Sequence, residues 1–418
     1  MRILYICHRI PYPPDKGDKI RVFHQLRALA ARHEVDLFTL ADQAEDMAHR
    51  SALLQYCRTV TVARIVPIVA RLRALPALLG SSPLTVPYFH SAELARAVRQ
   101  ALKQNSYDRI FVSCSAMAQY TEGIPDIPVL MDLVDVDSDK WTQYAGFARF
   151  PFSAIYRREG RCLREYERKV CERVSCVLVT TEREASLVRE ISASAEVRVV
   201  PNGVDIDFFN PAALPAAMGR PTVTFTGDMS YFPNQDAVEF FARKVLPLIR
   251  SSVPEVRFLI VGRKPSQNVQ RLQDIEGVEV TGFVPDVRTY LAQTHVAVAP
   301  FSIAAGIQNK ILEAMAFCLP VVATSKTARG LSAGAAAVVE TGHTAEELAA
   351  KVVCLLRDPE LARQKGLEGR RQVAAEYSWD TCLEQLLQLV ENPSASYLAD
   401  KKAHTSVLSG PTSSYTGT

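Results

Sequence analysis

Short runs of apolar, largely β-branched residues recur along this chain between longer stretches of helical periodicity. The runs show no alternation of apolar and polar residues, as expected of parallel strands that are buried on both faces. We therefore predict an α/β protein built from two doubly wound, Rossmann-like domains in tandem, with a cleft between them. The first series lies at 3–7, 35–40, 60–66, 110–113, 129–133, 177–179 and 197–200, and the second at 223–226, 258–261, 278–281, 296–299, 321–323 and 338–340.

The length of the chain also favours two domains, because 418 residues exceed one ordinary core. Pro-Asn-Gly at 201–203 ends the first series, and a Pro- and Ala-rich stretch at 210–221 leads into the second. Helical patterns at 346–356, 359–376 and 379–391 close the fold. We predict domains at 1–205 and 206–375, a helix at 376–392 that returns to the first domain, and a disordered Ser/Thr/Gly-rich tail at 393–418.

Charge and cysteine content narrow the class of protein. The formal net charge is only +3, which argues against nucleic acid as a partner. The nine cysteines form no C-x-x-C pair and are interpreted as reduced thiols. The N-terminus enters a strand pattern without a signal core, and no apolar run is long enough to span a bilayer. A cytoplasmic protein is expected.

Three strand-to-helix loops are candidates for ligand binding, because open α/β sheets bind ligands beyond the carboxyl ends of their strands. Gly17 in the loop 8–21 and Gly227 in the loop 224–234 each allow backbone amides to approach an anion. An ordinary loop explains the first stretch equally well, because it is not a G-x-G-x-x-G. In the third loop, Arg263 and Lys264 leave a strand at the same edge and suit a phosphate, although exposed basic pairs are more often simply solvated.

The fourth candidate is the stretch GIQNKILEAMAFCLPVVAT at 306–324, which places a lysine on the first turn of an apolar helix. A cation is unfavourable there unless an anion lies nearby. We expect the backbone amides of Gly306, Ile307, Gln308 and Asn309 and the ammonium of Lys310 to converge on a diphosphate. Glu313, one turn later, would accept hydrogen bonds from ribose hydroxyls. The alternative is a surface ion pair between Lys310 and Glu313, which contributes only about 0.3 kcal/mol.

The combination of motifs is more specific than its parts. Six motifs occur in an order that resembles GT-B glycosyltransferases of the retaining family 4 type. They are PNGVD, FTGDM, LIVGRKP, VTGFVPDVRTYL, VAVAPF and NKILEAMAFCLPVVAT. PYPPDKGDKIR and LMDLVDVDSDKW look similar to the sugar transferases of bacterial exopolysaccharide and PEP-CTERM gene clusters. The resemblance covers about residues 1–392 and is strongest over 197–324.

The resemblance implies roles for several residues. Gly17 lines the donor phosphates, Phe283 and Val284 hold the nucleobase, and Glu313 matches the second glutamate of the E-x7-E motif. The first glutamate of that motif would fall at Ala305 and is missing. The Arg and Lys that often clamp the diphosphate are also missing at 228–234, so that Arg263, Lys264 and Lys310 remain for this work.

The first-domain histidine of the family is replaced by Ser113, and the nearest substitute is the acidic cluster Asp132, Asp135, Asp137 and Asp139. We select Asp135 as the carboxylate that orients or deprotonates an acceptor hydroxyl. Helix capping and solvated charge are the alternatives for any one of these aspartates. The cluster imitates a D-x-D metal motif only weakly, and the histidines show no ligand spacing. Because basic groups and helix termini neutralise the leaving group in the GT-B arrangement, we expect neither a metal nor a cofactor.

Two stretches suggest where an acceptor approaches. Residues 47–92 contain no Asp or Glu but several arginines among apolar residues, and 149–170 adds a basic helical pattern. This composition suits the surface of an anionic membrane and a polyprenyl-linked or glycan acceptor. Packing against neighbouring helices explains the same apolar residues equally well.

We therefore expect a retaining glycosyltransferase that uses a nucleotide-sugar donor, acts in bacterial polysaccharide assembly and associates peripherally with the inner membrane face. One alternative is a sugar-nucleotide 2-epimerase on the same fold. Another is a non-catalytic nucleotide-sugar sensor, which is conceivable because Ala305 stands where the family has a glutamate and because the Arg/Lys clamp is missing. A dinucleotide-dependent oxidoreductase is disfavoured, because no G-x-G-x-x-G follows the first strand of either series.

Overall fold

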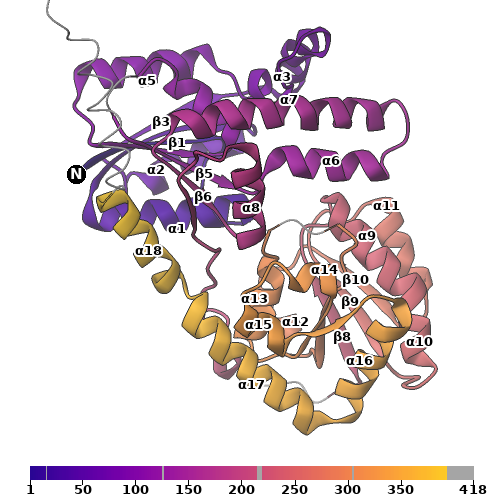
Figure 1. Ribbon diagram of the computed structural model, residues 1–418. Helices are drawn as coiled ribbons and strands as arrows, with labels where there is room; N and C mark the ends of the chain where they lie inside the picture. The colour runs from indigo at the N-terminus through magenta and orange to yellow at the C-terminus, as the bar shows by residue number, and fades with distance from the viewer. Residues whose placement is uncertain (16, 125–126, 214–218, 304–305, 393–418) are drawn as a thin grey trace, which may run out of the picture.

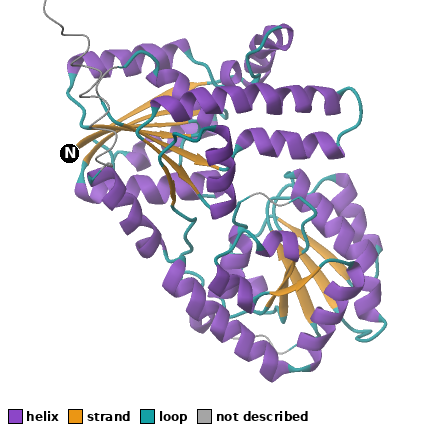
Figure 2. Cartoon of the chain, in the orientation of Figure 1, coloured by secondary structure: helices purple, strands orange, loops and turns teal. Residues whose placement is uncertain are grey.

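The computed structural model describes residues 1–15, 17–124, 127–213, 219–303 and 306–392 and contains two α/β domains (Figure 1). Each domain is built around a fully parallel sheet, and Figure 2 shows helices on both faces of each sheet. The predicted tail at 393–418 lies outside the described residues.

The first sheet has seven strands in the order β3-β2-β1-β4-β5-β6-β7, and the second has six in the order β10-β9-β8-β11-β12-β13. The strand order therefore reverses direction between β1 and β4 in the first sheet and between β8 and β11 in the second. The first-sheet strands are β1 Arg2–Cys7, β2 Glu34–Ala41, β3 Thr59–Arg64, β4 Arg109–Ser113, β5 Val129–Val134, β6 Cys176–Val179 and β7 Val197–Val199. The second-sheet strands are β8 Thr222–Thr226, β9 Arg257–Val261, β10 Val278–Gly282, β11 Val296–Ala299, β12 Val321–Thr324 and β13 Glu340–Gly342.

Every predicted apolar run overlaps one of these strands, which confirms the predicted fold class of two doubly wound domains. Two boundaries differ for local reasons. The run at 60–66 stops as a strand at Arg64 because Pro67 begins the next helix. The run at 338–340 starts as a strand only at Glu340, because Val338 still belongs to α15 (Ala333–Val338).

The helices connect successive strands and cover the sheets. In the first domain they are α1 Gly17–Arg32, α2 Arg50–Leu53, α3 Pro67–Ala74, α4 Thr85–Tyr88, α5 Ala92–Gln104, α6 Asp137–Phe147, α7 Phe152–Arg173 and α8 Glu182–Ile191. In the second they are α9 Phe232–Phe240, α10 Leu246–Arg250, α11 Gln267–Gln270, α12 Arg288–Leu291, α13 Asn309–Ala316, α14 Ser325–Ala328, α15, α16 Ala345–Arg357 and α17 Pro359–Glu376, and the last helix is α18 Trp379–Glu391. No helix in the described part of the chain is long and apolar enough to cross a membrane.

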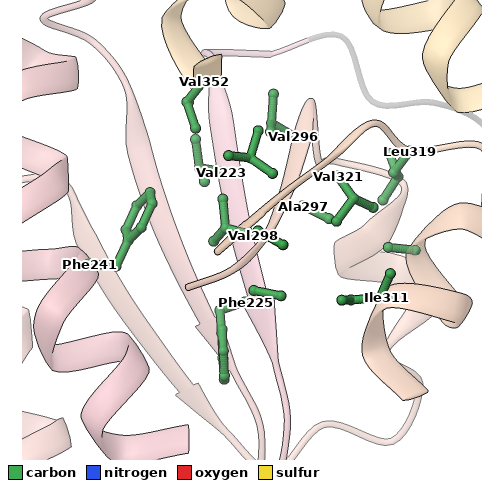
Figure 3. Close-up of a cluster of buried hydrophobic side chains, with 14 of the residues drawn as sticks. Val223, Phe225, Phe241, Val296, Ala297, Val298, Ile311, Leu319, Val321 and Val352 are labelled. Carbon is green, nitrogen blue, oxygen red and sulfur yellow. The ribbon is translucent and has the colours of Figure 1, made fainter. Parts of the chain in front are cut away.

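Each sheet is buried in apolar side chains. In the second domain, side chains of the central strands meet those of the surrounding helices, as Val298 and Phe225 meet Phe241 and Ile311 in Figure 3. Such residues are removed from water on both faces of the sheet, which explains why their runs lack polar alternation. The core is therefore complete inside each domain, and the loops at the strand ends are left to carry function.

The chain crosses between the domains twice, and the two crossings lie side by side. Val204 N donates to Tyr377 O at 2.7 Å, where the first crossing meets the end of α17. Next to it, Gly203 lies so close to Trp379 that a β-carbon would overlap the indole ring. Beyond the second crossing, α18 inserts Leu383, Leu386 and Val390 into the core of the first domain. Figure 1 shows α17 along the second domain and α18 along the first.

Candidate active site

The candidate site lies where the carboxyl ends of the two sheets meet. The loop after β1 leads to Gly17, the first residue of α1, and the loop after β11 leads to α13 in the other domain. These loops leave the points at which the strand order reverses, which is where open α/β sheets bind ligands. The position of a β-carbon on Gly17 lies 3.8 Å from Asn309 Nδ2, so the two predicted phosphate-binding segments approach each other closely across the domain boundary.

Lys310 is held in an apolar setting. Its Nζ donates to Asn234 Oδ1 at 2.8 Å and lies 3.9 Å and 4.6 Å from the ring centroids of Phe225 and Phe301. Burial lowers the pKa of the ammonium to about 7, although the Glu313 carboxyl acts in the opposite direction. Two aromatic faces stabilise a cation here, but no carboxylate within the described residues forms a salt bridge with it. An incoming anion would therefore not have to displace a carboxylate from this group.

Glu313 lies on the same helix, one turn after Lys310. Burial raises the pKa of its carboxyl to about 7, and the Lys310 ammonium lowers it in part. The surface ion pair considered from the sequence is absent among the described residues, because no salt bridge within 4.0 Å joins Lys310 and Glu313. Two ionisable groups with strongly shifted pKa values therefore share the first turns of α13, as is common at functional sites.

Gly227 follows β8 and provides room for this lysine. A β-carbon on Gly227 would stand 2.9 Å from Lys310 Nζ and 2.9 Å from Asn234 Nδ2. On the other side, a β-carbon on Gly262 would overlap the carbonyl of Gly227. The loops after β8 and β9 thus approach each other through two glycines, because any side chain at either position would push them apart.

Arg263 lies after β9, and its guanidinium already forms salt bridges with two carboxylates. Its Nη1 and Nε contact the carboxylates of Asp15, at 2.5 Å, and Asp228, at 3.0 Å. Asp15 belongs to the first domain, so this guanidinium bridges the two domains. Lys264 follows with an exposed side chain and a left-handed backbone, φ 54°. Of the two predicted phosphate ligands after β9, one holds carboxylates and the other faces solvent.

Asp135 faces Gly306 from the other domain. A β-carbon on Gly306 would overlap Asp135 Oδ1, and Gly306 itself has φ 61°. Burial raises the pKa of the Asp135 carboxyl. The other members of the acidic cluster are paired: Asp132 with Arg21, Asp137 with Lys140 and Asp139 with Arg183. Asp135 is thus the cluster member that reaches the second domain.

The remaining predicted residues occupy two places. Ile307 is buried in the second-domain core, Gln308 is the N-cap residue of α13, and Asn309 is its first residue. Phe283 and Val284 lie in the loop after β10, where the Phe283 side chain is 73% exposed. That loop is at the carboxyl edge of the sheet but is separated from β8 by β9. Ala305, the position of the missing glutamate, lies outside the described residues.

Three residues near the site were not selected from the sequence. Asn234 accepts a hydrogen bond from the Lys310 ammonium, and Asn202 of the PNG stretch donates to Asn309. Burial lowers the pKa of Lys140, but Asp137 and, to a smaller extent, Tyr231 and Asp135 raise it above its ordinary value. The sequence signal for all three was indirect: Asn202 lies in PNGVD, Lys140 in LMDLVDVDSDKW, and Asn234 in the stretch 228–234 where basic residues were expected. No group of three or more His, Cys, Asp or Glu suited to a metal ion occurs in the described ranges.

Comparison with known proteins gives two family matches. Residues 17–203 match the family described as Glycosyl transferase 4-like domain, and residues 220–358 match Glycosyl transferases group 1. A curated relative, D-inositol 3-phosphate glycosyltransferase of Mycolicibacterium paratuberculosis, is 27% identical over 260 residues. That match spans 56% of this chain and 57% of the relative, so it covers little more than half of the relative's length.

Solved structures match over nearly the whole chain. Sucrose-phosphate synthase from Thermosynechococcus elongatus superposes with a TM-score of 0.65 at 19% identity and covers 94% of this chain and 98% of its own. Anabaena HepE in complex with UDP-glucose gives a TM-score of 0.62 at 18% identity, covering 94% and 99%. At such identities the likeness establishes the fold, which is GT-B.

Proposed function

We propose that this glycosyltransferase of the GT-B fold transfers a sugar from a nucleoside diphosphate to a glycan or lipid-linked acceptor, with retention of anomeric configuration, in bacterial exopolysaccharide biosynthesis. Both halves of the chain match glycosyltransferase domain families, and HepE was solved with UDP-glucose. The single observation that carries the proposal is the approach of Gly17 to Asn309 beside Lys310, whose ammonium lies against two aromatic rings and forms no salt bridge within the described residues.

In this proposal the diphosphate lies against the α13 N-terminus and the ammonium of Lys310. The exposed amides of a helix N-terminus and a cation in an apolar setting both favour negative charge. As the glycosidic bond breaks, charge grows on the leaving diphosphate, and stabilising it should be the largest catalytic contribution. Glu313 accepts hydrogen bonds from the ribose, and Phe283 and Val284 contact the base.

The acceptor would enter from the first domain. Asp135 lies at the domain boundary against Gly306, where its carboxylate can orient an acceptor hydroxyl. Retention would follow if the acceptor attacks from the face that the diphosphate leaves, with the diphosphate as base, so that no enzymatic nucleophile is needed. The same arrangement neutralises the leaving group without a metal or cofactor.

A surface of the first domain supports a membrane-bound acceptor. Ile68 and Leu72 of α3 are 68% and 62% exposed, and Leu79 after it is 95% exposed. Arg71 and Arg73 are exposed on the same short segment, which suits an anionic surface. The segment is tied to α7, because Arg158 donates to Gly80 O and Ser82 O at 2.5 Å and 3.1 Å. Figure 1 shows α3 at the upper edge of the first domain, on the side away from the second. We propose that the protein acts on the cytoplasmic face of the membrane.

Donor binding and transfer can be tested together. Nucleotide sugars should raise the melting temperature of the protein when they bind the folded state. A donor that does so should then lose its sugar to extracted polyprenyl-linked acceptors, with release of the nucleoside diphosphate. A changed sugar nucleotide without any acceptor would instead indicate an epimerase. Binding without turnover on any acceptor would indicate a sensor, and either result would contradict the proposal.

Membrane association needs its own measurement. Sedimentation with phosphatidylcholine vesicles should increase when phosphatidylglycerol is added, and Leu72→Glu should reduce it. The matched control is Leu367→Glu, which changes a similarly exposed leucine on α17 of the second domain. Equal sedimentation with neutral and anionic vesicles would contradict a membrane role for α3.

A further inference from the structure

A buried polar chain runs from the first sheet to the α13 N-terminus. Arg21 Nε and Nη2 donate to the two carboxylate oxygens of Asp132 at 2.7 Å and 3.1 Å, and both side chains are almost completely buried. Arg21 Nη1 then donates to Asn202 Oδ1 at 3.0 Å. Asn202 Nδ2 in turn donates to Asn309 Oδ1 at 3.2 Å. Four side chains thus connect the first-domain core with the first residue of α13.

The direction of every bond in this chain follows from its first member. A guanidinium has donors only, so Asn202 must present its oxygen to Arg21 and its NH2 group to Asn309. Asn309 must then use its own oxygen to accept, which leaves its NH2 group on the opposite side. That side is occupied by Gly17, because Asn309 Nδ2 is the nearest atom to a β-carbon placed there, at 3.8 Å.

The hydrogen bonds between Arg21 and Asp132 cannot reverse their direction. Asp132 also accepts from Gln25 Nε2 at 2.6 Å and from Val134 N at 3.2 Å, and Gln25 Oε1 accepts from Tyr5 at 2.8 Å. The carboxylate thus accepts four hydrogen bonds, and within the described residues no second carboxylate forms a salt bridge with Arg21. Arg21 also donates to Pro201 O at 3.2 Å, which holds it against the PNG stretch.

We propose that Arg21 and Asn202 are positioning residues that hold the Asn309 amide with its NH2 group directed at an anionic part of the ligand beside Gly17. The inference rests on the proposed function, since it assigns these residues to the diphosphate site. If the amide turned over, its oxygen would face the anion, and an attraction would become a repulsion. A chain of this kind also couples donor binding to the contact between the domains.

The test is a double-mutant cycle on Asn202 and Asn309. Affinity for UDP and GDP is measured by calorimetry, with the melting temperature as a check on folding. Asn309→Ala should weaken binding of the preferred nucleotide about tenfold or more, as expected for a lost hydrogen bond to a charged group. Asn202→Ala should weaken it about threefold to tenfold, because the Asn309 amide is then free to turn. The double variant should bind no more weakly than Asn309→Ala alone.

A second variant keeps the test valid if Asn202→Ala folds poorly. Asn202→Asp retains an oxygen for Arg21 but cannot donate to Asn309, so it should turn the Asn309 amide over. Its added charge acts equally with and without Asn309, so the coupling between the two positions isolates the orientation effect. Losses that multiply independently, or an unchanged affinity in both Asn202 variants, would overturn the inference and leave the proposed function standing. A wild-type protein that binds neither nucleotide would overturn both.

Discussion

The carboxylate of Asp135 in the first domain occupies the space beside Gly306 of the second domain in which a β-carbon would stand. Gly306 also has φ 61°, a backbone conformation that costs a residue with a β-carbon about 1 kcal/mol. The two domains therefore meet at a point that only glycine fits. Both the domain contact and the proposed site require glycine here, because the backbone amides after Gly306 are the predicted diphosphate ligands.

Gly306→Ala should reduce nucleotide affinity and transfer more strongly than it reduces stability. The methyl group must displace Asp135 or shift the loop before α13, and Thr180 Oγ1 lies only 3.3 Å from its position. Calorimetry with UDP or GDP and a melting curve measure the two effects. Gly146→Ala is the matched control, because nothing lies within 4 Å of its β-carbon position. An unchanged nucleotide affinity in Gly306→Ala would exclude this loop from the site.

Lys310→Met and Glu313→Gln should each lose most transfer activity while they keep the fold. Methionine retains the apolar stem between Phe225 and Phe301 but removes the cation, and glutamine retains the shape of the glutamate but not its charge. Both changes remove a group whose charged form is disfavoured by its surroundings, as the shifted pKa values show, so the melting temperature should stay the same or rise. Wild-type turnover in both variants would contradict the assigned site.

The strands were readable from the sequence, and the contacts of the site were not. Parallel strands can be recognised in a sequence because both of their faces are buried, so each run is apolar along its whole length. The partners of the site residues carry no such local signal. Lys310 bonds to a residue 76 positions away, and Arg263 pairs with Asp15, 248 positions away. Only the folded chain brings these groups together, so the sequence could name Arg263 as a phosphate ligand but could not reveal that two carboxylates hold it.

The number of protons taken up or released when a nucleotide binds should depend on pH. The Lys310 pKa of about 7 lies below its ordinary value, so at about pH 8 the amine is largely neutral, and a bound diphosphate should draw up to one proton onto it. The Glu313 pKa of about 7 lies above its ordinary value, so at about pH 6 the carboxyl is largely protonated and should release a proton to accept ribose hydroxyls. Calorimetry in buffers of different ionisation enthalpy measures both.

Variants of Lys310 and Glu313 show which residue takes up or releases each proton. Lys310→Met should abolish uptake at the higher pH, and Glu313→Gln should abolish release at the lower pH. Proton uptake of the same size in wild type and both variants would show that other groups are responsible.

Asp15→Asn should tighten nucleotide binding, by up to about fivefold, since exposed ion pairs contribute 1 kcal/mol or less. The change frees Arg263 from a carboxylate 2.5 Å away and leaves it available to a diphosphate. Arg263→Ala should weaken binding, whereas Arg271→Ala, which alters an exposed arginine of the same domain that was not assigned to the site, serves as control. If Arg263→Ala binds as tightly as wild type, the arginine joins the domains and takes no part in donor binding.

Glu167→Gln should flatten the pH dependence of stability. Glu167 of α7 is fully buried and accepts from Ser138 N at 3.1 Å and Ser138 Oγ at 2.5 Å. Burial raises the pKa of this carboxyl to about 8, although the Ser138 bonds lower it in part. Because the folded pKa exceeds the unfolded one, the stabilising contribution is complete below about pH 4.5 and is lost as the pH rises through about 8.

Glutamine reproduces the neutral acid, since it can accept from the Ser138 amide and donate to the hydroxyl. Wild type and Glu167→Gln should therefore unfold at similar temperatures near pH 5, and the variant should become the more stable by about 1 kcal/mol or more near pH 9. Glu190→Gln, which changes an exposed carboxylate on α8, should follow wild type at both pH values. A difference between wild type and Glu167→Gln that is the same at both pH values would mean that the buried carboxyl does not titrate in this range, and that the contact between α6 and α7 does not depend on its proton.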